Sequence, residues 1–392
     1  MISVQEAKTL LAGYIQPLPS VSIPIEQAVN HVAAKTVLAP IAVPSFDNSA
    51  MDGYAVAFEE SRRRWEVVFE IPAGQVPTQS LLAGQAARIF TGAMIPSGAD
   101  TVIPQELITI EDERYIVCSD EKFKKGMNVR LKGQQCQAGM PIVLQGTVIN
   151  PGIAGLLASV GIRDISVNRQ PVVAIITTGS ELVALGQPLT EGKIYESNTY
   201  ILTAYLRLLG IDPVEQRVVP DHPEKLMEAI TELLNRCDVL IIAGGISVGD
   251  YDFVPSALEP LDFKTIFRKV KQKPGKHILV QQKDQQWIFG LPGNPVSTAM
   301  CFNQYVKPVL LAQAGHQNCF LPDLYLPLAT NYSKPIDMTH FLKAKIVNDS
   351  VVILPHQESF NLLSFNDCTY IALLEERLAE FQAGERIALF RW

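Results

Sequence analysis

The clearest hydrophobic pattern lies between residues 170 and 314, where short apolar runs alternate with longer amphipathic segments. The runs VVAIITTG, VEQRVVP, DVLIIAGG and WIFGLPG are typical of strands. The segments between and after them, SNTYILTAYLRLLG, PEKLMEAITELLNR and PVSTAMCFNQYVKPVLLAQAG, are typical of helices. Strands that are apolar on both faces and alternate with helices predict a parallel sheet covered by helices on both sides.

Helices are also predicted nearer the N-terminus. Residues 3–14 carry Ser3 as N-cap and Glu6 three positions later, which is a capping box. A second helix is predicted over residues 24–38, and a third over 149–161. These helical pieces are expected to pack together as a linker region, with the residues between them as an insertion.

The remaining segments have the texture of β-structure. Short β-like runs punctuated by Pro and Gly extend from about residue 42 to 140, and strands return from about 320 to 392 as a small barrel or sandwich. The predicted fold is therefore a multidomain α/β protein. Its expected parts are a discontinuous helical linker (1–41 and 141–169), an inserted β-rich domain (42–140), an α/β domain (170–316) and a C-terminal β-domain (317–392).

Composition narrows the class of protein. The 392 residues carry 33 basic and 40 acidic side chains, a net charge of −7, which argues against a general nucleic-acid surface. Six scattered cysteines without a CxxC pair suggest reduced thiols. The N-terminal helix pattern contains charges and is not a signal peptide, and no apolar run is long enough to span a bilayer. We expect a soluble cytoplasmic protein.

Carboxylates gather where the predicted strands end. In an open parallel sheet, ligands bind outside the carboxyl ends of the strands. Glu181, Asp221, Asp250 and Asp252 all follow such ends. Together with ligand phosphate oxygens, this edge could bind a hard cation such as Mg²⁺. The alternative for Asp221 is that it only caps the helix after it.

Two loops at the same edge suit a phosphate or another oxyanion. Gly244, Gly245 and Gly249 let backbone N–H groups approach a ligand. The segment 291–297 (LPGNPVS) opens a helix whose positive end attracts anions. No Walker A or GxGxxG nucleotide fingerprint occurs, and tight turns are the alternative explanation for the glycines.

Positive charge is concentrated in residues 267–277 (FRKVKQKPGKH). If this segment is extended up to Pro274, Lys269, Lys271 and Lys273 share one face and could meet an anionic ligand. The alternative is a solvated edge strand that lysines protect from aggregation. The sequence contains no clear Ser-His-Asp or Cys-His pattern, so it does not indicate covalent catalysis.

The run PSFDNSAMDGYAV (44–56) predicts a polar loop. It brings Asp47 and Asp52 into one short stretch, and two such carboxylates can meet a cation or a ligand hydroxyl. A solvated turn is the alternative reading of this run.

The segments PSFDNSAMDGYAV, RIFTGAMIPSGADTVIPQE, AGGISVGDYDF and GLPGNPVS, in that order and spacing, resemble the molybdopterin molybdenumtransferases, that is, the MoeA proteins and the E domain of gephyrin. The resemblance extends over nearly the whole chain. It implies an elongated homodimer whose active sites lie between the α/β domain of one subunit and the inserted domain of the other. The implied reaction uses Mg²⁺, inserts molybdenum from molybdate into adenylated molybdopterin, and releases AMP. A pterin adenylyltransferase and molybdoenzymes or their chaperones are the implied protein partners.

The resemblance also implies roles for individual residues, carried over by matching segments. The implied catalytic set is Asp52, Thr91, Glu181, Asp221 and Asp252, of which Glu181, Asp221 and Asp252 would bind the metal. The set implied to hold the cofactor is Ser247, Lys269, Lys273, Gly293, Asn294, Pro295, Ser297 and Ser364.

Several positions depart from the family pattern. Gln135 and Ser180 stand where the family usually has carboxylates, and an Arg-containing segment is replaced around Met338. A Gly-Ser-His run is replaced by residues 358–360 (ESF). These departures motivate two alternatives: a non-catalytic pterin-binding or scaffold paralogue, and a related pterin-nucleotide adenylyltransferase or pyrophosphatase.

Overall fold

The chain divides into two compact units in a computed structural model that describes residues 1–120, 123–246, 253–335 and 337–392. The larger unit comprises Met1–Val21, Asn30–Ala34 and Ser166–Trp392. The smaller unit comprises Ser22–Val29 and Lys35–Ile165. The multidomain α/β character is confirmed, whereas the four predicted boundaries stay a prediction.

The larger unit is built on a six-stranded sheet with the order β16-β13-β17-β21-β20-β18. Its strands are β13 (Val173–Thr178), β16 (Glu215–Val219), β17 (Val239–Ala243), β18 (Lys264–Lys269), β20 (His277–Lys283) and β21 (Gln286–Leu291). The four strands predicted from the alternation, β13, β16, β17 and β21, are parallel. Strands β20 and β18 add antiparallel, so the sheet is mixed and not wholly parallel. The two-residue connection between β20 and β21 permits only an antiparallel pair.

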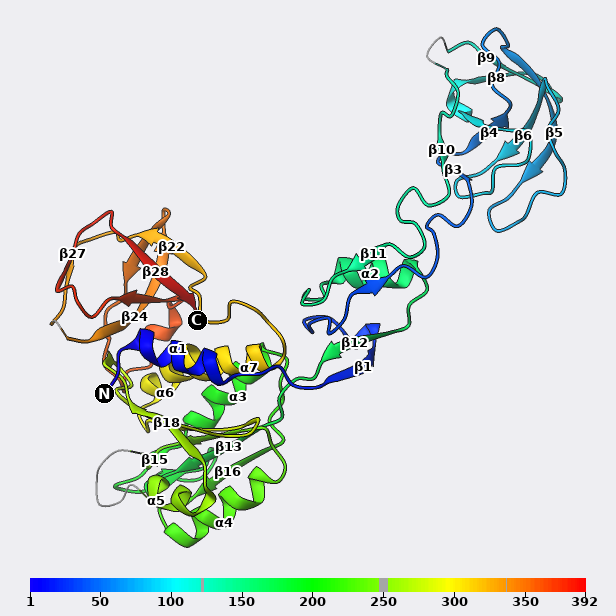
Figure 1. The fold of residues 1–392 in the computed structure, drawn as a ribbon. Helices are drawn as coiled ribbons and strands as arrows, with labels where there is room; N and C mark the ends of the chain where they lie inside the picture. The colour runs from blue at the N-terminus through cyan, green and yellow to red at the C-terminus, as the bar shows by residue number, and fades with distance from the viewer. Residues whose placement is uncertain (121–122, 247–252, 336) are drawn as a thin grey trace. The chain divides into compact units, whose positions relative to one another are not determined.

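Helices cover both faces of this sheet, as predicted (Figure 1). One face packs against α3 (Asn198–Leu208), α6 (Pro295–Cys301) and α7 (Lys307–Gln313). The other packs against α4 (Pro223–Leu234) and α5 (Val254–Leu258). Alternate residues of β13, β17, β20 and β21 face the two cores. In β13, for example, Val173 and Ile175 point to the first, and Ala174 and Ile176 to the second.

Helix α1 (Val4–Tyr14) begins with the predicted capping box, in which the side chains of Ser3 and Glu6 each accept from the other's backbone N–H. Its buried face joins the core of the larger unit. That face includes a lysine. Lys8 is only 7% exposed, donates to Gln304 Oε1 at 2.8 Å, and has its ammonium 4.1 Å from the centre of the Phe390 ring.

Gln304 lies in an irregular part of the predicted 295–315 helix. Between α6 and α7 the backbone forms a π-helix, Phe302–Val306, in which every residue is buried. Asn303 and Gln304, the polar residues of this turn, bond to each other, and Asn303 also donates to the carbonyl of Arg391 at 2.8 Å. The π-helix therefore turns two amides towards α1 and the C-terminal strand.

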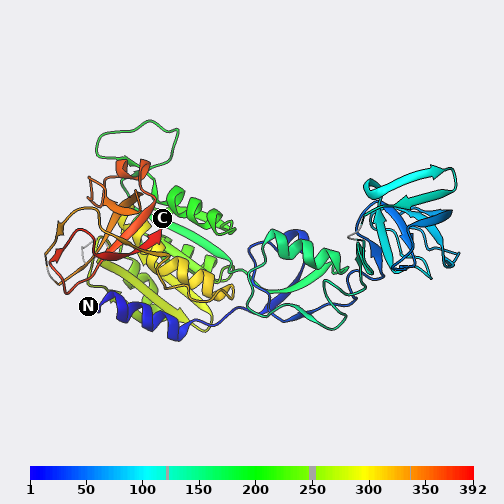
Figure 2. The same ribbon diagram turned by 90° about the horizontal axis from the view of Figure 1, so that it is seen from above.

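Five C-terminal strands and β19 form a second six-stranded sheet, so the predicted C-terminal β-structure is confirmed. This sheet lies beside α1 and the first sheet in both views (Figures 1 and 2). Its strands are β19 (Gln272–Lys273), β22 (Leu324–Pro327), β24 (Thr339–Val347), β25 (Ser350–Ile353), β26 (Tyr370–Leu374) and β28 (Arg386–Arg391). A bridge between Leu328 and Val351 connects the end of β22 to β25. Because β25 also pairs with β24, the strands return on themselves in the manner of a small barrel.

The smaller unit contains the predicted β-rich insertion, a six-stranded sheet with the order β7-β4-β6-β5-β9-β8. Its strands are β4 (Gly53–Val56), β5 (Arg64–Ile71), β6 (Gln85–Ile89), β7 (Thr101–Pro104), β8 (Ile108–Asp112) and β9 (Tyr115–Cys118). The shorter elements of this unit are η1 (Ile25–Gln27), β2 (Val37–Leu38), β3 (Asn48–Ser49), η2 (Gln105–Leu107), β10 (Val129–Arg130), β11 (Pro141–Val143) and α2 (Pro151–Ser159). Helix α2 confirms the prediction over 149–161, with Asn150 as its N-cap.

The helix predicted over residues 24–38 is wrong. Only a short 3-10 turn, Ile25–Gln27, forms there. Asn30 has a φ of 70°, in the left-handed region, which ends the helical path. Farther on, Ala33 bridges to Val167 in extended conformation, so the buried apolar residues of this stretch belong to β-like contacts. The remaining elements are β1 (Ser20–Pro24), β12 (Asp164–Asn168), β14 (Leu182–Val183), β15 (Ile194–Tyr195), η3 (Glu259–Leu261), β23 (Tyr332–Ser333), η5 (Leu363–Asn366) and β27 (Glu380–Phe381).

Candidate functional site

The carboxyl ends of the four parallel strands meet at one edge of the larger unit's sheet. Strands β16, β13, β17 and β21 end at Val219, Thr178, Ala243 and Leu291. The predicted acidic and glycine-containing loops begin directly after these residues. The expectation that they gather at one edge is therefore confirmed for the part of them that the structure describes.

Asp221 connects two of these loops. Its Oδ1 accepts from the Thr178 hydroxyl at 2.5 Å, and its Oδ2 accepts from the Ser180 N–H at 2.8 Å. In return, the Asp221 N–H donates to Ser180 Oγ at 3.3 Å. Helix α4 has His222 as N-cap without a side-chain cap bond, so the capping alternative for Asp221 is wrong. A serine at position 180 suits this pairing, because a carboxylate there would repel Asp221.

Glu181 is exposed beside this pair. Its backbone carbonyl accepts from the Ile194 N–H at 3.0 Å, at the start of the β14–β15 connection. Within the described residues, its carboxylate forms no hydrogen bond or ion pair, so both oxygens can meet a ligand. Ser247, Asp250 and Asp252, which complete the predicted acidic loop, lie outside the described residues.

The glycine at the end of β17 meets a strict steric requirement. Gly244 has a φ of +99°, and a Cβ at this position would lie 2.4 Å from the Thr178 carbonyl oxygen. Only glycine fits between the β13 and β17 loops here. The Gly244 N–H donates to the Leu291 carbonyl at 3.0 Å, so the β17 loop is also connected to the 291–297 loop.

The 291–297 loop leads into α6. The carbonyl of Gly293 accepts from the Asn198 side chain at 2.8 Å, and Asn294 is the N-cap position, with Pro295 as the first residue of the helix. Ser297 is 4% exposed and reaches the wall of a cavity. Three of the four predicted residues thus lie at the first turn of the helix or directly before it, and the fourth lies at the cavity.

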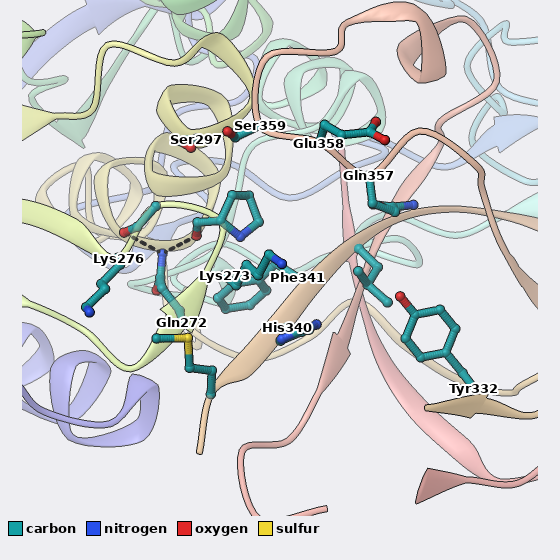
Figure 3. Close-up of a pocket in the computed structure, with 14 residues that line it drawn as sticks. Gln272, Lys273, Lys276, Ser297, Tyr332, His340, Phe341, Gln357, Glu358 and Ser359 are labelled. Carbon is teal, nitrogen blue, oxygen red and sulfur yellow. Dashed lines mark hydrogen bonds between the residues drawn. The ribbon is translucent and has the colours of Figure 1, made fainter. Parts of the chain in front are cut away.

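This cavity has a volume of about 540 Å³, and predicted residues are part of its lining. It is lined by Gln272, Lys273, Pro274, Gly275, Lys276, Ser297, Tyr332, Met338, His340, Phe341, Leu342, Gln357, Glu358 and Ser359. Figure 3 shows that Lys276, His340 and Ser359 come from three different segments around it. The turn that carries Lys276 is held from within, since the Gln272 amide donates to the carbonyls of Pro274 and Gly275 at 3.1 Å.

The prediction that residues 267–274 form one extended strand is wrong. Lys269, Lys271 and Lys273 do not share one strand face, because the strand ends at Lys269 and a second begins at Gln272. Between them the backbone pairs with Ile2, and the two strands belong to different sheets. Lys273 lines the cavity but Lys269 does not. Lys276, which the site prediction omitted, lines it too.

His340 was also missed, and so were the other cavity residues of the C-terminal sheet. Strand β24 pairs in parallel with β19, which puts His340 opposite Lys273. Burial, followed by the charges of Lys334 and Lys273, lowers the pKa of His340 to about 4. The imidazole is therefore neutral at pH 7, when it offers one donor and one acceptor.

Ser364 does not line the cavity. It is 7% exposed, and its hydroxyl lies 2.8 Å from the Pro355 carbonyl oxygen and 2.9 Å from that of His356. These carbonyls belong to the loop that brings Gln357 to Ser359 to the cavity wall. The predicted ligand-binding serine thus contacts the site through this loop.

Asp52 and Thr91, predicted from the smaller unit, form a close pair. Asp52 Oδ1 accepts from the Thr91 hydroxyl at 2.7 Å and from the Thr91 N–H at 2.8 Å. These bonds, aided by the charge of Arg88, lower the pKa of Asp52. Asp47 accepts from the Lys132 N–H at 2.6 Å and so shapes its loop. The bonds from Thr91 use Asp52 Oδ1, and Oδ2 forms no hydrogen bond with the residues that the structure describes.

The predicted metal set is only partly described. No group of three or more His, Cys, Asp or Glu suited to a metal ion occurs among the residues that the structure describes, and Asp252 is not one of them. Likewise, no helix in the described ranges is both long and apolar enough to cross a membrane.

Comparisons with known proteins agree across the chain. Residues 2–161 match the family model for the MoeA N-terminal region (domain I and II), and residues 174–312 match that for a probable molybdopterin binding domain. The chain is 34% identical to a molybdopterin molybdenumtransferase of Staphylococcus epidermidis, over 88% of this chain and 83% of that one. It is 32% identical to one of Staphylococcus aureus with the same coverage.

Solved structures of MoeA proteins also align with the whole chain. The crystal structure of the molybdopterin biosynthesis MoeA protein of Pyrococcus horikoshii aligns with a TM-score of 0.84 at 29% identity, over 100% of this chain and 99% of that chain. The crystal structure of a molybdopterin biosynthesis MoeA protein from Pyrococcus horikoshii OT3 aligns with a TM-score of 0.83 at 26% identity, over 100% of both chains.

Proposed function

Because the chain belongs to the molybdopterin molybdenumtransferase family, we propose that it inserts molybdenum from molybdate into molybdopterin. The proposed substrate is the adenylated form of molybdopterin, and the products are molybdenum cofactor and AMP. Both substrates are anions, so the site must supply positive charge and hydrogen-bond donors.

The observation that carries this proposal is the cavity beside the first turn of α6. Two cationic residues, Lys273 and Lys276, line it, and so does Ser297. A tetrahedral oxyanion is recognised by such donors, and a helix N-terminus adds favourable potential. His340 is neutral at pH 7, so in this cavity it acts as a hydrogen-bond donor and not as a cation. We assign molybdate to this cavity.

The sheet edge next to the cavity suits Mg²⁺ and the pterin phosphates. Both carboxylate oxygens of Glu181 are available to a ligand. Each carboxylate oxygen of Asp221 accepts one hydrogen bond, from Thr178 or Ser180, and keeps a second lone pair for a ligand. Carboxylates of this kind, with phosphate oxygens as further ligands, fit a hard cation. When bound, Mg²⁺ would neutralise charge on the phosphate as AMP leaves. The glycine at 244 lets the backbone come close to the ligand.

The direct test supplies adenylated molybdopterin, molybdate and Mg²⁺ to the full-length protein and follows AMP release and metal insertion. Turnover that requires all three supports the proposal, and tungstate in place of molybdate tests the choice of oxyanion. Lys276→Met is expected to raise KM for molybdate about tenfold, because it removes one ammonium donor. The exposed Lys225→Met is the control. A folded protein without turnover would refute the proposal.

The same assay separates the alternatives. Turnover with ATP and molybdopterin would indicate an adenylyltransferase, and AMP release without metal insertion would indicate a pyrophosphatase. Tight binding of the pterin nucleotide without either reaction would indicate a scaffold. The pairing of Ser180 with Asp221 favours the transferase over the scaffold, because this departure from the family pattern keeps Asp221 attached to the loop after β13.

We further propose a homodimer in which Asp52 and Thr91 serve the partner subunit's sheet edge. The two groups of predicted residues lie in different units of the chain, which is compatible with a site shared between subunits. Because the bonds from Thr91 lower the pKa of Asp52, its carboxylate is ionised. It can therefore accept a hydrogen bond from the ligand, or bind a cation that neutralises the charge of an anionic ligand.

The proposed protein partners are a pterin adenylyltransferase, which supplies the substrate, and a molybdoenzyme or chaperone, which receives the product. The proposed location is the cytoplasm. All six cysteines are free thiols, which is compatible with that compartment.

Mixing two inactive variants tests the shared site. Asp52→Ala and Asp221→Ala disable different halves, so a mixed dimer with a shared site has one intact centre. After random subunit exchange, activity should return to about a quarter of the wild-type value. If each site lies within one chain, every centre in the mixed dimer carries one substitution and activity stays absent.

A further inference from the structure

Lys343 is a buried cation behind the cavity. It lies in β24, three residues after His340, and is 0% exposed. Among the described residues, it forms no ion pair with a carboxylate, and burial lowers its pKa. An ammonium group in such a position destabilises the fold unless its donors are used. The groups that accept hydrogen bonds from the Lys343 ammonium therefore indicate what this residue does in the fold.

Those contacts are carbonyl groups of a single loop. Lys343 Nζ donates to the His356 carbonyl at 2.6 Å and to the Asn361 carbonyl at 2.9 Å. We call residues 355–361 the clamp loop. Both ends of this loop are thus fixed to one ammonium group, and the ammonium lies 5.5 Å from the centre of the Phe365 ring.

Two neutral side chains reinforce the attachment. The Gln357 amide accepts from the Lys343 N–H at 3.0 Å, and it donates to the carbonyls of Lys343 at 2.9 Å and Leu354 at 2.7 Å. Ser364 adds its hydroxyl at the carbonyls of Pro355 and His356. The clamp loop is therefore fastened to the backbone and the side chain of residue 343.

The clamp loop in turn forms one wall of the cavity. It supplies Gln357, Glu358 and Ser359 to the lining (Figure 3). Ser359 also reaches the first turn of α6, because its carbonyl accepts from Val296 N–H at 3.1 Å and its hydroxyl accepts from the Asn294 amide at 3.2 Å. Lys343 itself does not line the cavity. It acts on the cavity wall and the helix start through the loop.

We propose that Lys343 is a positioning residue that holds the clamp loop against the oxyanion cavity and thereby sets the affinity for molybdate. The assignment of molybdate to this cavity rests on the proposed function. The holding of the loop does not, since it follows from the contacts alone.

The test compares Lys343→Met, which keeps length and removes the donors, with Lys343→Arg, which keeps donors. Lys345→Met is the matched control, because Lys345 lies on the same strand but is part-exposed and pairs with Asp367. Hydrogen exchange of the clamp loop is expected to increase about tenfold in Lys343→Met and to stay unchanged in Lys345→Met. The dissociation constant and KM for molybdate should rise about tenfold, with kcat less affected. Lys343→Arg should recover part of both losses.

Unchanged exchange of the clamp loop in Lys343→Met overturns the positioning role, whatever the activity. Faster exchange with unchanged molybdate binding overturns the link to affinity. If Lys343→Met does not fold, Lys343→Gln, which also removes the ammonium group, is measured in its place with the same criteria. A wild-type protein without turnover refutes the proposed function, but the exchange result still decides the role of Lys343.

Discussion

Lys8 offers a quantitative test of the core of the larger unit. Its ammonium is nearly buried, with a neutral amide and an aromatic ring as its contacts. Burial lowers its pKa from 10.5 to about 7. Below pH 7 the lysine is charged in both the folded and the unfolded chain, and burial of the charge destabilises the fold fully. As the pH rises from about 7 towards 10.5, the folded state loses the proton first, and this destabilisation disappears.

The magnitude follows from the shift. Since one pKa unit corresponds to about 1.4 kcal/mol, the charged form destabilises the fold by on the order of 5 kcal/mol at low pH. About 2 kcal/mol of this is recovered between pH 7 and pH 9. Lys8→Met removes the charge but leaves the Gln304 acceptor unpaired, at a cost of roughly 1–3 kcal/mol. The variant should be more stable than wild type at pH 7, by on the order of 2 kcal/mol.

The assay is urea unfolding at pH 7 and pH 9, followed by tryptophan fluorescence. Wild type should gain about 2 kcal/mol of unfolding free energy relative to Lys8→Met between these two pH values. The exposed Lys225→Met serves as control and should follow wild type. Parallel pH dependences of wild type and Lys8→Met would show that Lys8 keeps its ordinary ionisation in the fold, and the reasoning from burial would be wrong.

Three smaller changes test the site and its frame. Gly244→Ala should destabilise the larger unit by about 1–3 kcal/mol in urea unfolding, because its Cβ would meet the Thr178 carbonyl; equal stability would show that the loop can move away. Gly155→Ala should instead stabilise the smaller unit by about 1 kcal/mol, since it lies in a helix with nothing within 4 Å of the new methyl group. Thr91→Val should raise the pKa of Asp52, measured by NMR titration, because it removes one of two donors to that carboxylate; an unchanged pKa would mean that the backbone bond suffices.

Two features could be predicted from the sequence: the strands and helices with a regular hydrophobic pattern, and the residues that directly follow the end of a strand. Alternating apolar runs identified the parallel strands, and the position of Asp221 after β16 placed it at the carboxyl edge. A local signal sufficed in each case. Residues 24–38 misled the prediction, because their apolar positions occur at helical spacing while Asn30 adopts a left-handed φ.

The cavity could be predicted only in part. Lys273 and Ser297 lie in segments with charge or helix-start signals. His340 and Gln357 lie far along the chain. They reach the cavity because the chain leaves the first sheet after β18, and β19 then pairs with β24 in the second sheet. No local pattern reports such a change of sheet. The partner of a two-residue strand is decided by tertiary packing, not by its own sequence.

The π-helix at Phe302–Val306 has a consequence for how this chain can vary. A π-turn accommodates one residue more than an α-turn. Deletion of one residue there could restore a regular helix while α6 keeps its place at the cavity and α7 keeps its place on the sheet. The amide that meets Lys8 would then be lost or rotated by about 100°, the angle per residue of an α-helix. This turn is thus a natural point for a one-residue insertion or deletion, and relatives with a shorter helix should lack a buried lysine at position 8.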